Sequence, residues 1–230
     1  MRISIILPTW NNLGYLKVCL DSIKKNSKYE HDINVHVNDG SDGTVEYLSS
    51  NGIKFNHSVA NMGLCKGANS AATLAETDYI IYTHDDMYFL PNWDFFLNEE
   101  IKKLKTNLYY ISGTMMGPKG CGFLEFNCGT TFNDFDEAKL LKNFHNFNYF
   151  DHQGTHWAPH LIHKTIWDRV GGFSKEFDPG FASDTDLNMK LWKAGVRIFK
   201  GLNNFKVYHF GSVSLRKKKE LIRNKGNRSF

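Results

Sequence analysis

Strand-like and helix-like segments alternate through the first hundred residues, and this alternation constrains the fold more than any other feature of the chain. Short apolar runs are typical of buried strands, and most are followed by apolar residues at helical spacing. Strands are expected over 3–7, 33–37, 53–57 and 79–82, and helices over 13–23, 44–49, 68–75 and from Pro91 onward. Such alternation favours an α/β fold with a mainly parallel central sheet and helices on both faces.

The second half of the chain is less regular. Residues 113–150 are rich in Gly, Phe and Asn, which predicts strands joined by long loops. A helix expected over 183–194 has Ser183 as its predicted N-cap and Asp186 as the capping-box partner. The other expected elements are a helix over 165–170 and strands over 196–198 and 205–210.

The composition is that of an ordinary globular enzyme. The 230 residues are 41% hydrophobic and 23% charged, enough to bury a full core. Because no repeat or Pro/Gly linker divides the chain, we predict one domain over residues 1–214 and a basic tail over 215–230. No apolar run has the length of a membrane span or a secretion signal, so a cytoplasmic protein is expected.

The four cysteines contain no CxxC pair, so neither a zinc site nor a disulfide framework is predicted. A bond between Cys121 and Cys128 could close a loop. Free thiols are the preferred interpretation, because a cytoplasmic compartment is reducing.

The net charge of +4 is concentrated at the C-terminus. Residues 212–230 contain seven Lys or Arg and one Glu, so the rest of the chain has a small acidic excess. The basic run 216–219 could contact anionic lipid or phosphate and hold the protein at a membrane surface. A solvated terminus is the favoured alternative, and no nucleic acid is predicted as a partner.

Polar turns follow the predicted strands at the edge of the sheet where α/β proteins bind their ligands. Pro8 and Thr9 end the first strand, where the backbone can clamp a flat base, and Asn11 adds a polar edge. Asp39 follows the second strand, and a glycine-bearing turn at Asn61 precedes a helix. Simpler roles are also open: Asn11 as a helix cap and Asp39 as an Asx turn.

Six motifs stand along the chain in the order typical of the family 2 glycosyltransferases. Each is weak alone, but six in order are specific, and the resemblance spans about residues 3–214. The motifs are Ile5-Ile6-Leu7-Pro8-Thr9-Trp10-Asn11, Val37-Asn38-Asp39-Gly40-Ser41, Asn61-Met62-Gly63 through Gly67-Ala68-Asn69, His84-Asp85-Asp86, Ser183-Asp184-Thr185-Asp186-Leu187 and His209-Phe210-Gly211-Ser212.

The resemblance implies a single GT-A domain, the Rossmann-like fold of nucleotide-diphospho-sugar transferases. It also implies an inverting, metal-assisted enzyme of the hexosyltransferase type. Such an enzyme moves a sugar from a UDP- or dTDP-sugar to a hydroxyl of a glycan, lipid-linked or protein-linked acceptor.

The resemblance implies that Asp39 accepts an N–H of the uracil or thymine ring. Backbone N–H groups of the turn at Asn61 and Gly63 would face the nucleotide or its phosphates, as helix N-termini do. The family position that often carries Arg or Asn is Ala68 here, which leaves Lys66 as a substitute. A tight strand-to-helix connection is the simpler interpretation of this turn.

The segment His84-Asp85-Asp86 occupies the place of the family's DXD metal motif. A diphosphate leaving group is neutralised by Mg²⁺ or Mn²⁺ held by carboxylates. The resemblance makes Asp86 a metal ligand, Asp85 a donor-site residue and His209 a neighbour of the metal and the diphosphate. His84 replaces the first acid, which leaves the identity of the metal open.

Asp184 matches the Asp of the family's Glu-Asp motif, with Ser183 in place of the Glu. An inverting transfer needs one base for the acceptor hydroxyl, and we expect Asp184 to be that base. Its place in the first turn of a helix predicts an ionised carboxylate. Trp157 and His160 fall where relatives shape the acceptor pocket, although a core Trp is nearly as well supported.

Two other functions bear on the same pattern of residues. A non-catalytic nucleotide-sugar or glycan-binding domain of the same fold is kept open by His84 and Ser183, which depart from the family's acids. A nucleotidyltransferase is disfavoured, because residues 7–20 lack the expected glycine- and arginine-rich phosphate loop.

Overall fold

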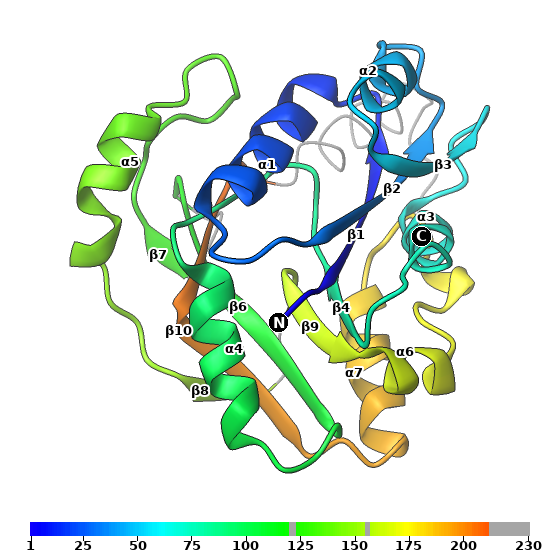
Figure 1. Ribbon diagram of the computed structural model, residues 1–230, viewed down its shortest axis with the longest axis vertical. Coiled ribbons are helices and arrows are strands. Elements are labelled where there is room, and N and C mark those ends of the chain that lie inside the picture. The colour runs from blue at the N-terminus through cyan, green and yellow to red at the C-terminus, as the bar shows by residue number, and fades with distance from the viewer. Residues whose placement is uncertain (120–122, 155–156, 212–230) are drawn as a thin grey trace, which may run out of the picture.

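The computed structural model describes residues 1–119, 123–154 and 157–211 (Figure 1). Its strands form one ten-stranded sheet flanked by helices. The strands are β1 (Ser4–Trp10), β2 (Asp32–Asn38), β3 (Lys54–Ser58), β4 (Tyr79–Tyr82), β5 (Met87–Phe89), β6 (Tyr109–Gly117), β7 (Leu124–Glu125), β8 (His152–Gln153), β9 (His160–His163) and β10 (Ile198–His209). The helices are α1 (Leu13–Asn26), α2 (Thr44–Ser50), α3 (Leu64–Ala72), α4 (Trp93–Lys103), α5 (Glu137–Asn143), α6 (Lys164–Val170) and α7 (Ser183–Lys193), with short 3₁₀ turns at Phe144–Asn146 and Lys175–Phe177.

The strand order is β3-β2-β1-β4-β9-β6-β10-β5, with β7 beside β6 and β8 beside β10. The four strands β3, β2, β1 and β4 are parallel, as the alternating pattern predicted. The sheet is mixed beyond them, because β9 runs antiparallel to both β4 and β6. β6 and β10 are again parallel, and β5 is antiparallel to β10.

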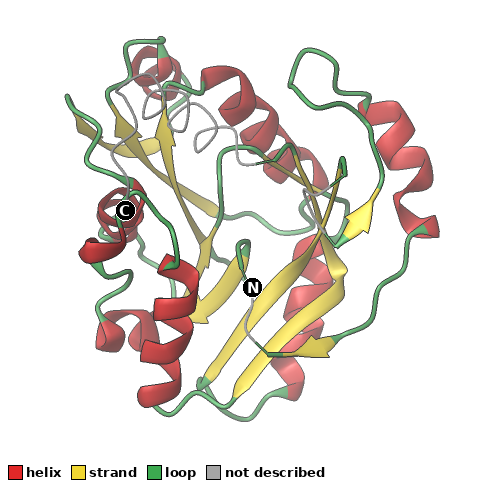
Figure 2. Cartoon of the chain, turned by 180° about the vertical axis from the view of Figure 1, so that it is seen from behind, coloured by secondary structure: helices red, strands yellow, loops and turns green. Residues whose placement is uncertain are grey.

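Different layers cover the two faces of the β5–β10 pair. On one face Trp93 of α4 packs against Phe89 and Phe205, with ring centroids 4.9 and 5.5 Å apart. Neighbouring residues of a strand point to opposite faces, so Tyr88 and Tyr208 lie on the other side. There they join a second apolar cluster with residues of the segment 123–147, which includes α5 (Figure 2). Helices therefore lie on both faces of the sheet, as predicted.

Several local predictions were wrong. The expected strands 196–198 and 205–210 form one strand, β10, whose pairing with β6 shifts register between Leu202 and Lys206. The expected N-cap Ser183 is instead the first residue of α7, and its hydroxyl donates to the carbonyl of Gly180. Asp186 makes no cap bond, because residue 182 holds the N-cap position. The short strands β5, β8 and β9 and the helix α5 were not predicted.

Three of the cysteines, Cys19, Cys65 and Cys128, are buried free thiols, as the composition predicted. Cys121 lies outside the described residues, and so does the whole basic tail 215–230. Within the described part of the chain, no helix combines the length and the apolar character needed to cross a lipid bilayer.

Candidate active site

The carboxyl ends of β1 and β2 are joined by polar side chains. Asn11 adopts a positive φ of 46°, and its Nδ2 donates to Asp39 Oδ2 at 2.9 Å. The side-chain Oδ1 of Asn11 accepts the N–H of Gly40 at 3.0 Å. Asn11 thus does not cap α1, whose first N–H, that of Leu13, donates to Asp42.

Asp39 forms the predicted Asx turn, since its Oδ1 accepts the N–H of Ser41 at 3.3 Å. Hydrogen bonds, chiefly from the Ser41 side chain, hold the pKa of Asp39 below its ordinary value. Each Asp39 oxygen has a second lone pair, so these bonds leave room for a base N–H. The contact between Asp39 and a nucleobase stays a prediction.

The loop after β4 is fastened to the neighbouring elements by buried bonds. The hydroxyl of Thr9 donates to Asp85 Oδ2 at 2.7 Å, which joins the end of β1 to this loop. The thiol of Cys19 on α1 lies 3.7 Å from the carbonyl oxygen of His84. The N–H of Phe210 donates to the carbonyl of Asp86 at 3.1 Å. These bonds hold the acidic loop against both β1 and the end of β10.

His84, Asp86 and His209 converge at this loop. Antiparallel pairing of β10 with β5 sets His209 opposite Met87, next to Asp86. His209 Nε2 lies 3.6 Å from Asp86 Oδ1, and one donor atom from each of the three side chains lies within 4.8 Å of the others. Burial lowers the pKa of His84 to about 4, so its imidazole is neutral and can donate a lone pair at physiological pH.

Asp184 lies in the first turn of α7, in a different chemical environment. Its Oδ1 is buried and meets no hydrogen-bond donor among the described residues. Burial raises the pKa of Asp184 to about 7, and a backbone hydrogen bond opposes this shift. The expected helix-terminus effect is therefore outweighed by desolvation, and the carboxyl is poised near neutrality instead of being fully ionised.

Tyr82 at the end of β4 lies near both acidic groups. It is buried, and burial followed by the negative charges of Asp184, Asp85 and Asp86 raises its pKa. The pKa of Tyr110 is also raised by burial and by the charge of Asp184. The acidic loop and the start of α7 therefore both lie close to Tyr82.

The turn before α3 departs from its prediction. Asn61 Oδ1 accepts the N–H of Gly63, and the N–H of Cys65 in the first turn donates to Asp178 Oδ1 at 2.8 Å. A backbone N–H of the turn that was predicted to face phosphate therefore already donates to a protein carboxylate. Lys66 lies in the same turn with its side chain exposed to solvent.

The two predicted acceptor residues lie in different surroundings. Trp157 is 47% exposed, which agrees with a surface for stacking. His160 is fully buried, and its Nδ1 lies 2.9 Å from the hydroxyl of Tyr110. The prediction that His160 contacts an acceptor is not supported, because its buried ring packs against Tyr82, with the two ring centroids 5.2 Å apart.

A family model described as glycosyl transferase family 2 matches residues 4–158, more than half of the chain. The chain belongs to glycosyl transferase family 2. The matched region includes all the strand ends in the first half of the chain at which site residues were predicted. Asp184 and His209 lie beyond it. No curated protein sequence matches the chain.

Solved structures of glycosyltransferases share the fold of this family 2 chain. A fragment of S. aureus TarS, residues 1–349, has a TM-score of 0.69 at 16% identity over 97% of this chain and 64% of its own. The same fragment in complex with UDP-GlcNAc gives 0.68 at 17% identity, over 93% and 61% of the two chains. GalNAc-T7 with UDP, GalNAc and Mn²⁺ gives 0.68 at 15% identity, over 91% and 44%.

These likenesses identify the GT-A fold. The family 2 chain spans less than two thirds of the length of each of these three structures. Of the three convergent residues, the sequence predicts Asp86 and His209 but not His84, which stands where the family's motif has an acid. The signal that could have revealed His84 as a ligand is the presence of two histidines, His84 and His209, at motif positions rich in polar groups.

Proposed function

We propose that the protein is an inverting glycosyltransferase that moves a hexose from a UDP- or dTDP-sugar to an acceptor hydroxyl. The observation that carries the proposal is the Asp184 carboxyl, buried among neutral groups and facing the same region as the Asp85–Asp86 loop. A single base with a pKa near the working pH is what an inverting transfer requires. The S. aureus TarS fragment that binds UDP-GlcNAc supports a UDP-sugar as the donor.

The nucleotide is proposed to bind at the carboxyl ends of β1 and β2. Pro8 and Thr9 supply backbone on one side of the base, and Asn11 orients the Asp39 carboxylate. The Asn61–Gly63 turn borders this region through the Met62 N–H, which donates to Asn38 Oδ1 at 2.9 Å. A pyrimidine N–H is the matching donor for Asp39, which already accepts bonds from Asn11 and Ser41.

The His84, Asp86 and His209 cluster fits a divalent cation. Two imidazoles with one carboxylate suit Mn²⁺ better than Mg²⁺, which prefers oxygen ligands throughout. GalNAc-T7, which shares the fold, carries Mn²⁺. When bound, the cation would neutralise the negative charge of the diphosphate leaving group.

The chain's own groups account for the rest of the transfer. Asp184 takes the proton of the acceptor hydroxyl, and the oxygen attacks the anomeric carbon from the face opposite the diphosphate. The bond between that carbon and the diphosphate oxygen breaks, which inverts the configuration. The buried phenols of Tyr82 and Tyr110 limit access of water to the base.

The acceptor is proposed to be a glycan that stacks on an aromatic surface made by Phe123, Tyr149, Phe150 and Trp157. Rings of the first two are stacked at 5.4 Å, and Phe150 is 63% exposed. β9 begins three residues after Trp157 and leads to Tyr82, so this surface lies on the segment that enters the site. Flat aromatic faces suit the apolar face of a sugar ring.

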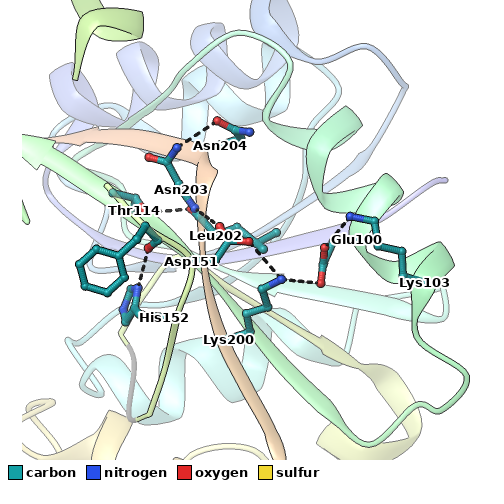
Figure 3. A network of polar contacts seen from close by, with 10 residues as sticks. Glu100, Lys103, Thr114, Asp151, His152, Lys200, Leu202, Asn203 and Asn204 are labelled. Carbon is teal, nitrogen blue, oxygen red and sulfur yellow. Dashed lines mark hydrogen bonds and ion pairs between the residues drawn. The ribbon is translucent and has the colours of Figure 1, made fainter. Parts of the chain in front are cut away.

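A polar network holds this surface on the irregular part of β10 (Figure 3). The N–H of Tyr149 donates to Asn203 Oδ1 at 2.7 Å, and the N–H of Asn203 donates to Asp151 Oδ1 at 2.9 Å. Lys200 Nζ lies 3.1 Å from Asp151 and 2.8 Å from Glu100 on α4. The aromatic segment is therefore anchored to both the sheet and a helix.

The test is calorimetry of a panel of UDP-, dTDP- and GDP-sugars with Mn²⁺, with Mg²⁺ or with EDTA, followed by sugar transfer to glycan acceptors. We expect UDP-sugar binding that requires the cation, and transfer that Trp157→Ala slows through a higher acceptor KM. Preference for GDP would contradict the pyrimidine site. Donor binding without any turnover would favour the non-catalytic alternative.

A further inference from the structure

The segment that leads into Asp184 is fastened to α3 at two points. The first is Asn69, whose Oδ1 accepts the N–H of Phe173 at 2.9 Å and whose Nδ2 donates to the carbonyl of Phe173 at 2.8 Å. A Cβ at Gly172 would overlap with the Asn69 side chain, so the close approach requires glycine there. Lys190 of α7 adds a bond to the Gly172 carbonyl at 2.6 Å.

The second point is Asp178. Its Oδ1 accepts the N–H of Cys65 at 2.8 Å, in the first turn of α3. Gly63, with a φ of 100°, makes the approach possible, because a Cβ at this position would overlap with the same oxygen. A carboxylate at a helix N-terminus is favoured both by the hydrogen bond and by the helix dipole.

Five residues separate Asp178 from Asp184, and local bonds stiffen this short connection. The N–H of Gly180 donates to the carbonyl of Phe177 at 2.6 Å, and the hydroxyl of Ser183 donates to the carbonyl of Gly180 at 2.8 Å. The side chain of Ser183 also hydrogen-bonds the thiol of Cys65. A displacement at Asp178 is therefore expected to reach the first turn of α7.

We propose that Asp178 is a positioning residue, which holds Asp184 in the site by fastening residues 178–184 to the N-terminus of α3. The inference rests on the proposed role of Asp184 as the base. The turn at Gly63 has its own hydrogen bonds to Asn61 and Asn38, so the donor side of the site is expected to stay ordered without this contact.

The environment of Asp184 supplies a readout of its position. The groups that face it are the Cys65 thiol from α3, the Tyr82 phenol from β4 and the Tyr110 phenol from β6. Burial raises the pKa of all three, so they are neutral near pH 7, and burial alone raises the pKa of Asp184. An Asp184 that swings toward water should regain a lower pKa, which a merely destabilised protein would not show.

The experiment compares Asp178→Ala, Asp178→Ser and Asp178→Asn, with the full chain and the donor chosen by the calorimetric panel. Alanine and serine cannot reach the Cys65 N–H, and we expect kcat to fall about 10–100-fold while the affinity for UDP stays unchanged. The acidic limb of the kcat profile should move to lower pH. Asp178→Asn keeps the acceptor oxygen and should recover most of kcat.

The matched control is Asp136→Ala. Asp136 Oδ1 caps α5 by accepting the N–H of Lys139 at 2.8 Å, which is the same chemistry away from the site. This variant should lose a similar amount of thermal stability and keep the wild-type kcat and pH profile.

Two outcomes separate the inference from the proposed function. If Asp184→Asn is inactive while Asp178→Ala or Asp178→Ser keeps the wild-type kcat and pH limb, the positioning role is wrong and the base assignment stands. If Asp184→Asn remains fully active, the proposed function fails whatever the Asp178 variants do. A failure of the alanine variant to fold leaves the serine variant to decide.

Discussion

The Asp86 site (His84, Asp86 and His209) and the Asp184 site (Asp184 among Cys65, Tyr82 and Tyr110) differ in what surrounds the carboxyl. Asp86 faces two imidazoles, one of them 3.6 Å away. Asp184 faces a thiol and two phenols, all of them neutral.

The difference shows how neighbours decide the role of a buried carboxyl. The imidazole and carboxylate donor atoms of the Asp86 site lie within 4.8 Å of one another and suit a cation, and the carboxylate can bind that cation in its ionised form. A carboxyl surrounded by neutral groups cannot easily hold its charge, so its pKa rises to about 7 and it can exchange a proton. The comparison predicts one site for charge neutralisation and one for proton transfer.

The largest effect is expected from Asp184→Asn. The amide keeps the shape of the side chain but cannot accept a proton, so transfer should slow by about 10²–10⁴-fold while UDP affinity stays near wild type. Transfer kinetics and calorimetry on the same preparation measure both. Asp186→Asn, two residues along α7, is the control and should stay active; an inactive control would move the base to Asp186.

Next in size is the effect of Asp86→Ala on donor binding. Loss of the one carboxylate leaves only the two imidazoles as ligands, which should weaken cation-dependent UDP binding by on the order of 3 kcal/mol. Calorimetry with Mn²⁺ is the measurement, and wild-type protein in EDTA should match the variant. Unchanged affinity in both would show that Asp86 holds no cation and would leave the phosphate charge to Lys66 and other basic groups.

A smaller effect on binding is expected from Asp39→Ala. If Asp39 accepts a buried base N–H, its loss should weaken UDP binding by about 1–3 kcal/mol. Asp32→Ala is the matched control, because Asp32 begins the same strand and pairs with exposed Arg2. Equal UDP affinity of all three proteins would remove Asp39 from the nucleotide site and leave it as the Asx turn that its bond to Ser41 forms.

A graded change is expected from pH. The pKa of Asp184 is raised to about 7, so its base form is lost as the pH falls through 7, and kcat should drop about tenfold per unit below that point. Asp39, whose pKa is lowered, stays ionised over the same interval, so its contact with the base should add no pH dependence to UDP affinity. Kinetics and calorimetry between about pH 5 and pH 9 compare the two. A kcat that is flat below pH 7 would assign proton transfer to another group.

The parallel strands at the start of the sheet were predictable because their periodicity is local. The strand over 79–82 and the helices after β1 and β2 follow directly from the spacing of apolar residues. β9 was missed because a histidine stands at each end of its Leu-Ile pair, so it lacks the apolar run that marks the equally short β4, and it is the strand that breaks the parallel run. The two short strands predicted near the C-terminus are parts of one long strand, β10. Asn203 and Asn204 lie where its pairing with β6 shifts register, and the strand continues beyond them.

The sequence by itself determined the α/β class, the polar strand ends and the acids Asp86 and Asp184 that mark the site. Tertiary structure decided how those acids behave. The antiparallel pairing of β10 with β5 brings His209 beside Asp86, and burial of the first turn of α7 raises the pKa of Asp184. The contact between Asp178 and α3 likewise joins residues more than one hundred positions apart. Periodicity describes neighbours along the chain, whereas burial and long-range hydrogen bonds arise only when distant segments pack together.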